Sequence, residues 1–103
     1  MHTMVVRMTV DPARTGEVAR HLREDVAGWA RQQPGFVSGQ WLCQDGGTQA
    51  LGVVVFASRA DADRAAQGPR GYRRDGARAW NIEDVTLYEQ AASACPRRSG
   101  APA

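Results

Sequence analysis

Four consecutive apolar residues stand in the middle of the chain, in the stretch GVVVF from Gly52 to Phe56. β-Branched and aromatic residues are typical of strands, and successive side chains of a strand point to opposite faces of its sheet. We therefore predict a strand that is apolar on both faces. One face carries Leu51, Val53 and Val55, and the other carries Val54 and Phe56. Each of these faces needs a cover.

The N-terminal third predicts a strand followed by a helix. Met4 to Val10 reads as a strand, and Asp11-Pro12 is typical of a helix start, because Asp caps free N–H groups and Pro suits the first helical position. Apolar residues at spacings of three and four then predict one buried helix stripe, and Pro34-Gly35 ends the helix. The stripe consists of Val18, Leu22, Val26 and Trp29.

The middle of the chain predicts a β-hairpin. Phe36 to Gln44 reads as a second strand and Ala50 to Ala57 as a third. Between them lies Asp45-Gly46-Gly47, which favours a tight turn because glycine accepts the positive φ that such turns require.

The last part of the chain predicts a capped helix and a fourth strand. Ser58, three residues before an aspartate, is typical of a helix cap, and Gly68-Pro69 is expected to end this short helix. Residues 68–79 read as a loop and Trp80 to Glu89 as the last strand. We expect one domain over residues 1–92 and a flexible C-terminal tail over residues 93–103.

The order β-α-β-β-α-β predicts an α+β ferredoxin-like fold, a four-stranded antiparallel sheet with both helices on one face. One face of the sheet is then left without a cover. If Val54 and Phe56 lie on that face, their exposure costs about 1.5–3 kcal/mol for each large side chain. We therefore expect a second copy of the chain to cover it, as a homodimer through the β-sheet face.

Composition and charge exclude some classes of partner. With 103 residues, of which 43% are hydrophobic and 23% charged, the chain fits one ordinary domain. All thirteen basic residues are arginine, but the net charge of +2 is too small to attract a polyanion. An RNA-recognition domain shares the order of elements, yet it needs aromatic residues on its central strands, which are aliphatic here. We expect no nucleic-acid partner.

The sequence also favours a cytoplasmic protein that has no membrane partner. No apolar stretch approaches the roughly 20 residues that cross a bilayer, and the start has no basic segment followed by an apolar one. Cys43 and Cys95 lack metal-like spacing and read as free thiols in a reducing compartment, with Cys43 expected to be buried.

The stretch QQPGFVSGQWLCQDGGTQALGVVVFASRADADRAA, residues 32–66, resembles the dimeric α+β barrel superfamily and is similar to its antibiotic biosynthesis monooxygenase (ABM) domain family. The resemblance covers Met4 to Ala92. It implies homodimers that form through their sheets, and a pocket between sheet and helices. Family members include cofactor-independent oxygenases of aromatic polyketides, quinol monooxygenases, haem-degrading enzymes and proteins of unknown role.

The residues of the haem-degrading members do not transfer to this chain. Those members resemble one another in an Asn on the first strand and a His on the second helix, and both are absent here. His21 lies on the first helix instead, and we expect it to be a partly buried structural residue. The resemblance therefore disfavours haem degradation.

A cofactor-independent oxygenase needs a pocket that excludes water, aromatic walls for a flat phenolic substrate, and a polar group that holds or deprotonates it. The sequence contains no flavin, dinucleotide or metal motif, so we expect no cofactor. Arg7 has an alternative role, a salt bridge to Asp84 or Glu83. The candidate catalytic residues are Tyr72 and Arg7, and the candidate substrate-binding residues are Trp41, Trp80, Ser38, Gln40 and Phe56.

These observations favour a cofactor-independent monooxygenase that acts on a small aromatic or phenolic substrate, of the polyketide or quinol kind. Two alternatives remain open. The chain could be a non-catalytic ligand-binding or accessory dimer, because its polar candidates are few. It could also be a polyketide cyclase or isomerase, because a shaped pocket can guide ring closure without redox chemistry.

Overall fold

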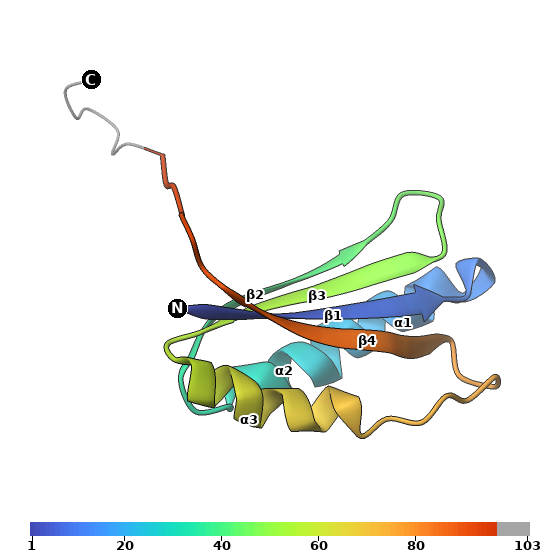
Figure 1. Cartoon of the computed structure of the whole chain (residues 1–103). Coiled ribbons are helices and arrows are strands. Elements are labelled where there is room, and N and C mark those ends of the chain that lie inside the picture. Colours follow the sequence, from blue (N-terminus) through green and yellow to red (C-terminus); the bar gives the residue numbers. More distant parts are fainter. Residues whose placement is uncertain (97–103) are drawn as a thin grey trace.

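The computed structural model describes residues 1–96, which form a four-stranded antiparallel sheet with its helices on one face (Figure 1). The sheet order is β2-β3-β1-β4, and β1 pairs with both β3 and β4. The strands are β1 (His2–Val10), β2 (Phe36–Cys43), β3 (Gln49–Phe56) and β4 (Trp80–Glu89). The helices are η1 (Pro12–Arg14), α1 (Thr15–His21), η2 (Leu22–Val26), α2 (Ala27–Arg31) and α3 (Arg59–Arg70). The predicted ferredoxin-like fold is confirmed.

The first helix is one rod built from segments of different pitch. The Asp11 carboxylate accepts the Ala13 N–H at 2.9 Å and caps the 3₁₀ turn η1, as the Asp-Pro pair predicts. α1 then passes into η2, a π-helical turn, and returns to α-helix in α2. π-Helical turns are frequent at functional sites, because the wider turn changes which side chains share a face.

Helix α3 runs three residues further than predicted. The Ser58 hydroxyl accepts the Asp61 N–H at 3.1 Å, which confirms the predicted cap. Gly68-Pro69 does not end α3, which continues to Arg70 with Pro69 buried inside it. Pro69 stands in the last turn of α3, and the chain keeps turning past it: the Tyr72 N–H bonds the Pro69 carbonyl at 3.3 Å.

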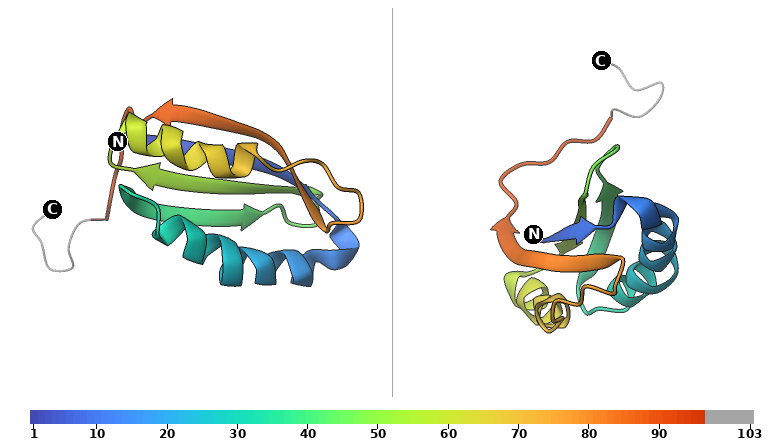
Figure 2. Two further views of the ribbon diagram at one scale, coloured as in Figure 1. Left: turned by 90° about the horizontal axis from the view of Figure 1, so that it is seen from below. Right: turned by 90° about the vertical axis from the view of Figure 1, so that its right-hand side faces the viewer.

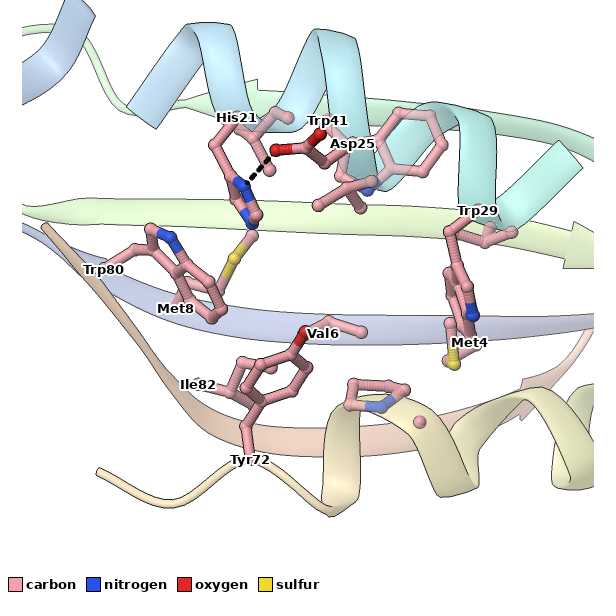
Figure 3. Close-up of a pocket in the computed structure, with 15 residues that line it drawn as sticks. Met4, Val6, Met8, His21, Asp25, Trp29, Trp41, Tyr72, Trp80 and Ile82 are labelled. Atoms are coloured by element: carbon pink, nitrogen blue, oxygen red, sulfur yellow. Dashed lines mark hydrogen bonds and ion pairs between the residues drawn. The ribbon is translucent and has the colours of Figure 1, made fainter. Parts of the chain in front are cut away.

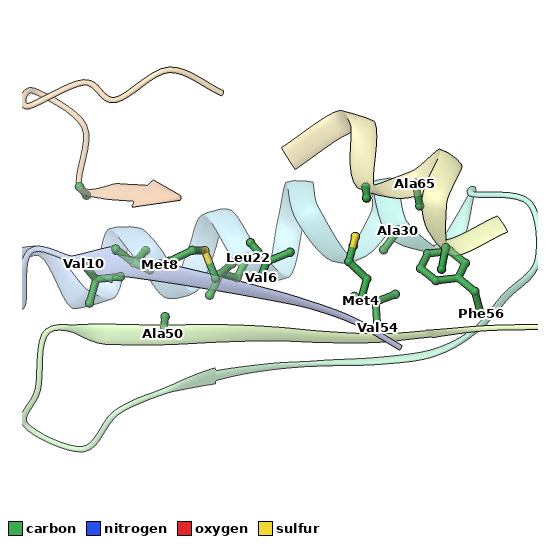
Figure 4. Packing of buried hydrophobic residues seen from close by; sticks show 14 residues of the cluster. Met4, Val6, Met8, Val10, Leu22, Ala30, Ala50, Val54, Phe56 and Ala65 are labelled. Atoms are coloured by element: carbon green, nitrogen blue, oxygen red, sulfur yellow. The ribbon is translucent and has the colours of Figure 1, made fainter. Parts of the chain in front are cut away.

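The hydrophobic core lies between the sheet and the helices (Figures 2 and 4). Val54 and Phe56 belong to it, with 1% and 0% of their surface exposed. Taking these two residues as the uncovered set is therefore wrong. β3 leads directly into Ser58 and α3, and the small buried side chains of α3 leave room for the Phe56 ring. The buried residues of α3 are Ala62, Ala65, Ala66 and Pro69.

The opposite face of the sheet carries Leu51, Val53 and Val55, all only partly buried. Within residues 1–96, no layer of this chain covers it (Figure 2). Polar groups lie beside these apolar residues: Arg7 pairs with Asp84 on this face. One face of the predicted two-sided strand is thus covered by helices, and its other face is open.

Three remaining expectations have different outcomes. Cys43 is exposed rather than buried, because it lies at the end of the edge strand β2. The predicted tail falls partly on residues 97–103, which are outside the described residues. In the described part of the chain, none of the helices has the length and apolar character that a membrane crossing requires.

Candidate functional site

A cavity of about 300 Å³ lies between the sheet and the helices (Figure 3). Its floor comes from the sheet, one wall from the long first helix, and the other from the end of α3 and the segment after it. Most of the lining is apolar or aromatic. The lining residues are Met4, Val6, Met8, His21, Leu22, Asp25, Val26, Trp29, Trp41, Val54, Gly68, Pro69, Tyr72, Trp80 and Ile82.

The titratable pair His21 and Asp25 lies in the helix wall. His21 ends α1 and Asp25 is in the π turn that follows, so the two side chains share the face that lines the cavity. His21 Nδ1 is 2.9 Å from Asp25 Oδ2. An ionised carboxylate only accepts hydrogen bonds, so Nδ1 carries the proton and donates it. In the neutral imidazole, Nε2 is then left as an acceptor.

One aromatic ring stacks on this histidine, and a second ring packs against the first. Trp80 stacks on the His21 ring, with centroids 4.8 Å apart and planes 13° apart. Tyr72 meets Trp80 edge to face at 5.2 Å, and its hydroxyl points toward the cavity (Figure 3). These contacts hold the imidazole plane in one orientation, which a group that transfers a proton requires.

Arg78 holds the wall that carries Tyr72. Its guanidinium lies 4.4 Å from the Trp80 ring centroid and 5.4 Å from that of Tyr72, within range of cation–π contact. It donates to the Trp80 carbonyl at 3.0 Å and to Asn81 Oδ1 at 3.1 Å. Asn81 Oδ1 also accepts the Asp75 N–H at 2.8 Å. The segment between α3 and β4 is therefore tied to the start of β4 on the C-terminal side of Tyr72.

The other end of the cavity is apolar. Trp29 and Met4 lie there, away from His21 (Figure 3). Trp29, whose place in the apolar stripe predicted a core residue, is instead 36% exposed and lines the cavity. The Trp41 ring lies over Gly52, where an added Cβ would be 3.1 Å from the indole nitrogen. The cavity is thus polar at one end and apolar at the other.

Comparison with protein families gives a match over most of this chain. Residues 1–70 match the sequence profile of the family described as antibiotic biosynthesis monooxygenase (ABM). The chain belongs to the ABM family. The match confirms the resemblance drawn from residues 32–66. Among curated proteins, no sequence match is found.

Solved structures share the fold of this ABM protein at low sequence identity. A haem-degrading protein of Mycobacterium tuberculosis, solved with two haems in its active site, has a TM-score of 0.71 at 17% identity, covering 92% of this chain and 100% of its own. A Streptomyces coelicolor monooxygenase with bound nanaomycin D has a TM-score of 0.62 at 18% identity, covering 93% and 92%. A cofactor-independent oxygenase of Streptomyces nogalater has a TM-score of 0.58 at 23% identity, covering 93% and 97%.

The cavity of this ABM protein brings together three of the predicted site residues. Tyr72, Trp41 and Trp80 all line it. They come from the segment after α3, from β2 and from β4, so no short stretch of sequence contains them.

The other four predicted site residues lie elsewhere. Phe56 is fully buried in the core, where its ring meets Phe36 edge to face at 6.5 Å. Ser38 and Gln40 pair with Val55 and Val53, so strand alternation places them on the open face of the sheet.

Arg7 also lies on the open face. Its Nε donates to Asp84 Oδ2 at 2.7 Å, which is the salt-bridge alternative for this residue. This hydrogen bond is the main reason why the pKa of Asp84 is lowered. On the same face, Thr9 and then Arg74 lower the pKa of Glu83 by hydrogen bonding to it. The charged groups of Arg7, Asp84 and Glu83 therefore act on the open face and not in the cavity.

The sequence reasoning missed the His21–Asp25 pair as a site. A signal was present: the two residues are four apart on a helix, so they share a face, and they flank Leu22 and Val26 of the apolar stripe. Treating His21 as structural overlooked its carboxylate partner. Within residues 1–96, no cluster of three His, Cys, Asp or Glu side chains has the arrangement of a metal site.

Proposed function

We propose that this ABM protein is a cofactor-independent monooxygenase of a small aromatic phenol, of the polyketide or quinol kind. Family membership supports oxygenation as the reaction class. The observation that carries the proposal is the His21–Asp25 pair in the wall of a cavity that is otherwise aromatic and apolar. Such a cavity fits a flat substrate and provides one group that can take a proton from it.

In the proposed reaction, His21 is the general base. Nε2 takes a proton from the substrate, a hydroxylated ring system with an activated CH₂ group, and Asp25 stabilises the imidazolium that forms. The substrate anion gives electrons to molecular oxygen, and a carbon–oxygen bond forms at the CH₂ carbon to give a hydroperoxide. Loss of the second proton and cleavage of the O–O bond give a carbonyl group and water. The balance is CH₂ plus O₂ to C=O plus H₂O.

Tyr72 has a second role in this proposal. Its hydroxyl points toward the cavity and can donate a hydrogen bond to the oxygen that develops negative charge. The ring contacts with Trp80 and Arg78 hold the Tyr72 side chain for this purpose.

We also propose that the chain works as a homodimer whose two open sheet faces meet, in the cytoplasm. Leu51, Val53 and Val55 are partly buried in the single chain, and Leu42 and Tyr88 are exposed beside them. A second copy would bury these side chains, which stabilises the pair by the hydrophobic effect. The exposed thiols Cys43 and Cys95 fit a reducing compartment.

Oxygen uptake with a hydroxyanthrone tests the reaction. His21→Gln should lower the turnover rate by about 100- to 10,000-fold, the usual contribution of a general base. Asp25→Asn should have a smaller effect, because Asp25 orients the base and its side chain is 69% exposed. Tyr72→Phe should lower kcat more than it raises KM.

The matched control is His2→Gln, since His2 lies at the start of β1 and does not line the cavity. It should leave the rate unchanged. Full activity of His21→Gln would refute the role of the base, and a rate that falls only in Arg7→Ala would move the site to the open face. Binding without oxygen uptake would favour the accessory dimer, and a rearranged product without oxygen uptake would favour a cyclase or isomerase.

A further inference from the structure

The cavity has a defined length between its two ends. Met4 and Met8 lie under opposite ends of it on β1, and four residues of a strand span about 13 Å. His21 and Trp29 lie at the same two ends on the first helix, and eight helical residues span about 12 Å. Both backbone spacings put the two ends of the cavity roughly 12 Å apart.

The apolar end lacks charged groups in its lining. Trp29 and Met4 line the part of the cavity that lies away from His21 (Figure 3), Val54 pairs with Met4, and Gly68 lies against the Trp29 ring. Placing a charged or unpaired polar group among these side chains would be unfavourable, because nothing there replaces its hydrogen bonds to water. This end fits an unsubstituted part of a ligand.

The Trp29 ring lies against Gly68 at this end. A Cβ at Gly68 would lie 2.8 Å from Trp29 Cζ2 and 3.3 Å from Cη2, closer than van der Waals contact. The Trp29 ring therefore rests in the space that a side chain at position 68 would occupy. Glycine inside a helix costs about 1 kcal/mol relative to alanine. The contact with Trp29 gives a physical reason for a glycine in α3.

We propose that Gly68 and Trp29 determine the length of substrate that the cavity accepts. The substrate is an elongated fused aromatic compound with its hydroxyl group at the His21 end and an unsubstituted ring at the Trp29 end. This inference rests on the proposed function, that the cavity takes an aromatic phenol. A methyl group at position 68 pushes the Trp29 ring into the cavity and shortens it from the apolar end.

The test measures binding of phenol, 1-naphthol and 1-hydroxyanthracene by calorimetry without oxygen, so that no turnover is needed. Gly68→Ala should weaken binding of the three-ring compound at least about tenfold, as overpacking of a filled site does, and leave phenol unchanged. Gly16→Ala is the matched control, because a Cβ at that helical glycine meets nothing within 4 Å. It should change no affinity.

A double-mutant cycle isolates the contact. Trp29→Leu removes the ring that the new methyl group would touch, so adding Gly68→Ala to this variant should have no further effect on the three-ring compound. The inference is overturned if Gly68→Ala weakens all three compounds equally or none, or if its effect persists beside Trp29→Leu.

The outcomes separate this inference from the proposed function. Ring-size selectivity that follows Gly68 and Trp29, without oxygen uptake by the wild-type protein, would support the inference and refute the oxygenase. Oxygen uptake without that selectivity would refute the inference alone. Failure of the wild-type protein to bind any of the three compounds would refute both.

Discussion

Val53 lies in the middle of the open sheet face, paired with Val5 on β1 and Gln40 on β2. If two sheets meet there, Val53→Asp places a carboxylate inside an apolar interface. A two-fold interface contains each substitution twice. The variant therefore tests directly whether a second copy covers this face.

The expected loss of dimer stability follows from the burial of Val53. Val53 is already mostly buried in the single chain, so a partner adds at most about a third of the 1.5–3 kcal/mol of full burial, or about 1 kcal/mol for two copies. Removing two carboxylates from water costs several kcal/mol more. The dimer should weaken by roughly 5 kcal/mol, which is more than about a thousandfold in the dissociation constant.

Sedimentation equilibrium at micromolar concentration measures this change. The wild-type protein should be a dimer and Val53→Asp a folded monomer. Val54→Ala is the control on the other face of the same strand: it removes two buried methyl groups, worth about 1.6 kcal/mol plus a cavity term, and should lower the free energy of unfolding without dissociating the dimer. A wild-type monomer, or a Val53→Asp dimer at the same concentration, would refute the reasoning.

Two further predictions concern stability. Phe56→Ala should lower the free energy of unfolding by about 3–5 kcal/mol in urea titrations, because the ring is fully buried; a loss below about 1 kcal/mol would contradict its place in the core. The hydrogen bond from Arg7 lowers the pKa of Asp84, so this pair stabilises the fold above the ordinary carboxyl pKa and stops doing so as pH falls through the lowered pKa. Asp84→Asn should therefore lower the free energy of unfolding at neutral pH, and this free energy should then fall less steeply as the pH is lowered. Unfolding at a series of pH values measures both effects, and an unchanged acid dependence would contradict this.

The sequence alone determined the order of the elements and where the helices begin. Helix caps and turns are local: Asp11 and Ser58 bond to backbone groups two or three residues away, so their effect is visible in a short stretch of sequence. Strand alternation is also local, so the division of β3 into two apolar sets could be read directly. These features were enough to predict the ferredoxin-like fold.

Only the tertiary structure decided which of those sets meets the helices and which residues share the cavity. Val54 lies beneath the helices and Val53 does not, because packing against the helices selects one face and alternation alone is symmetric. For the same reason Arg7, on the face opposite Met8, points away from the cavity. His21 and Trp80 are far apart in sequence, and they stack because the fold brings the end of α1 to the start of β4. Contacts of this kind depend on how distant segments pack, and no local pattern encodes them.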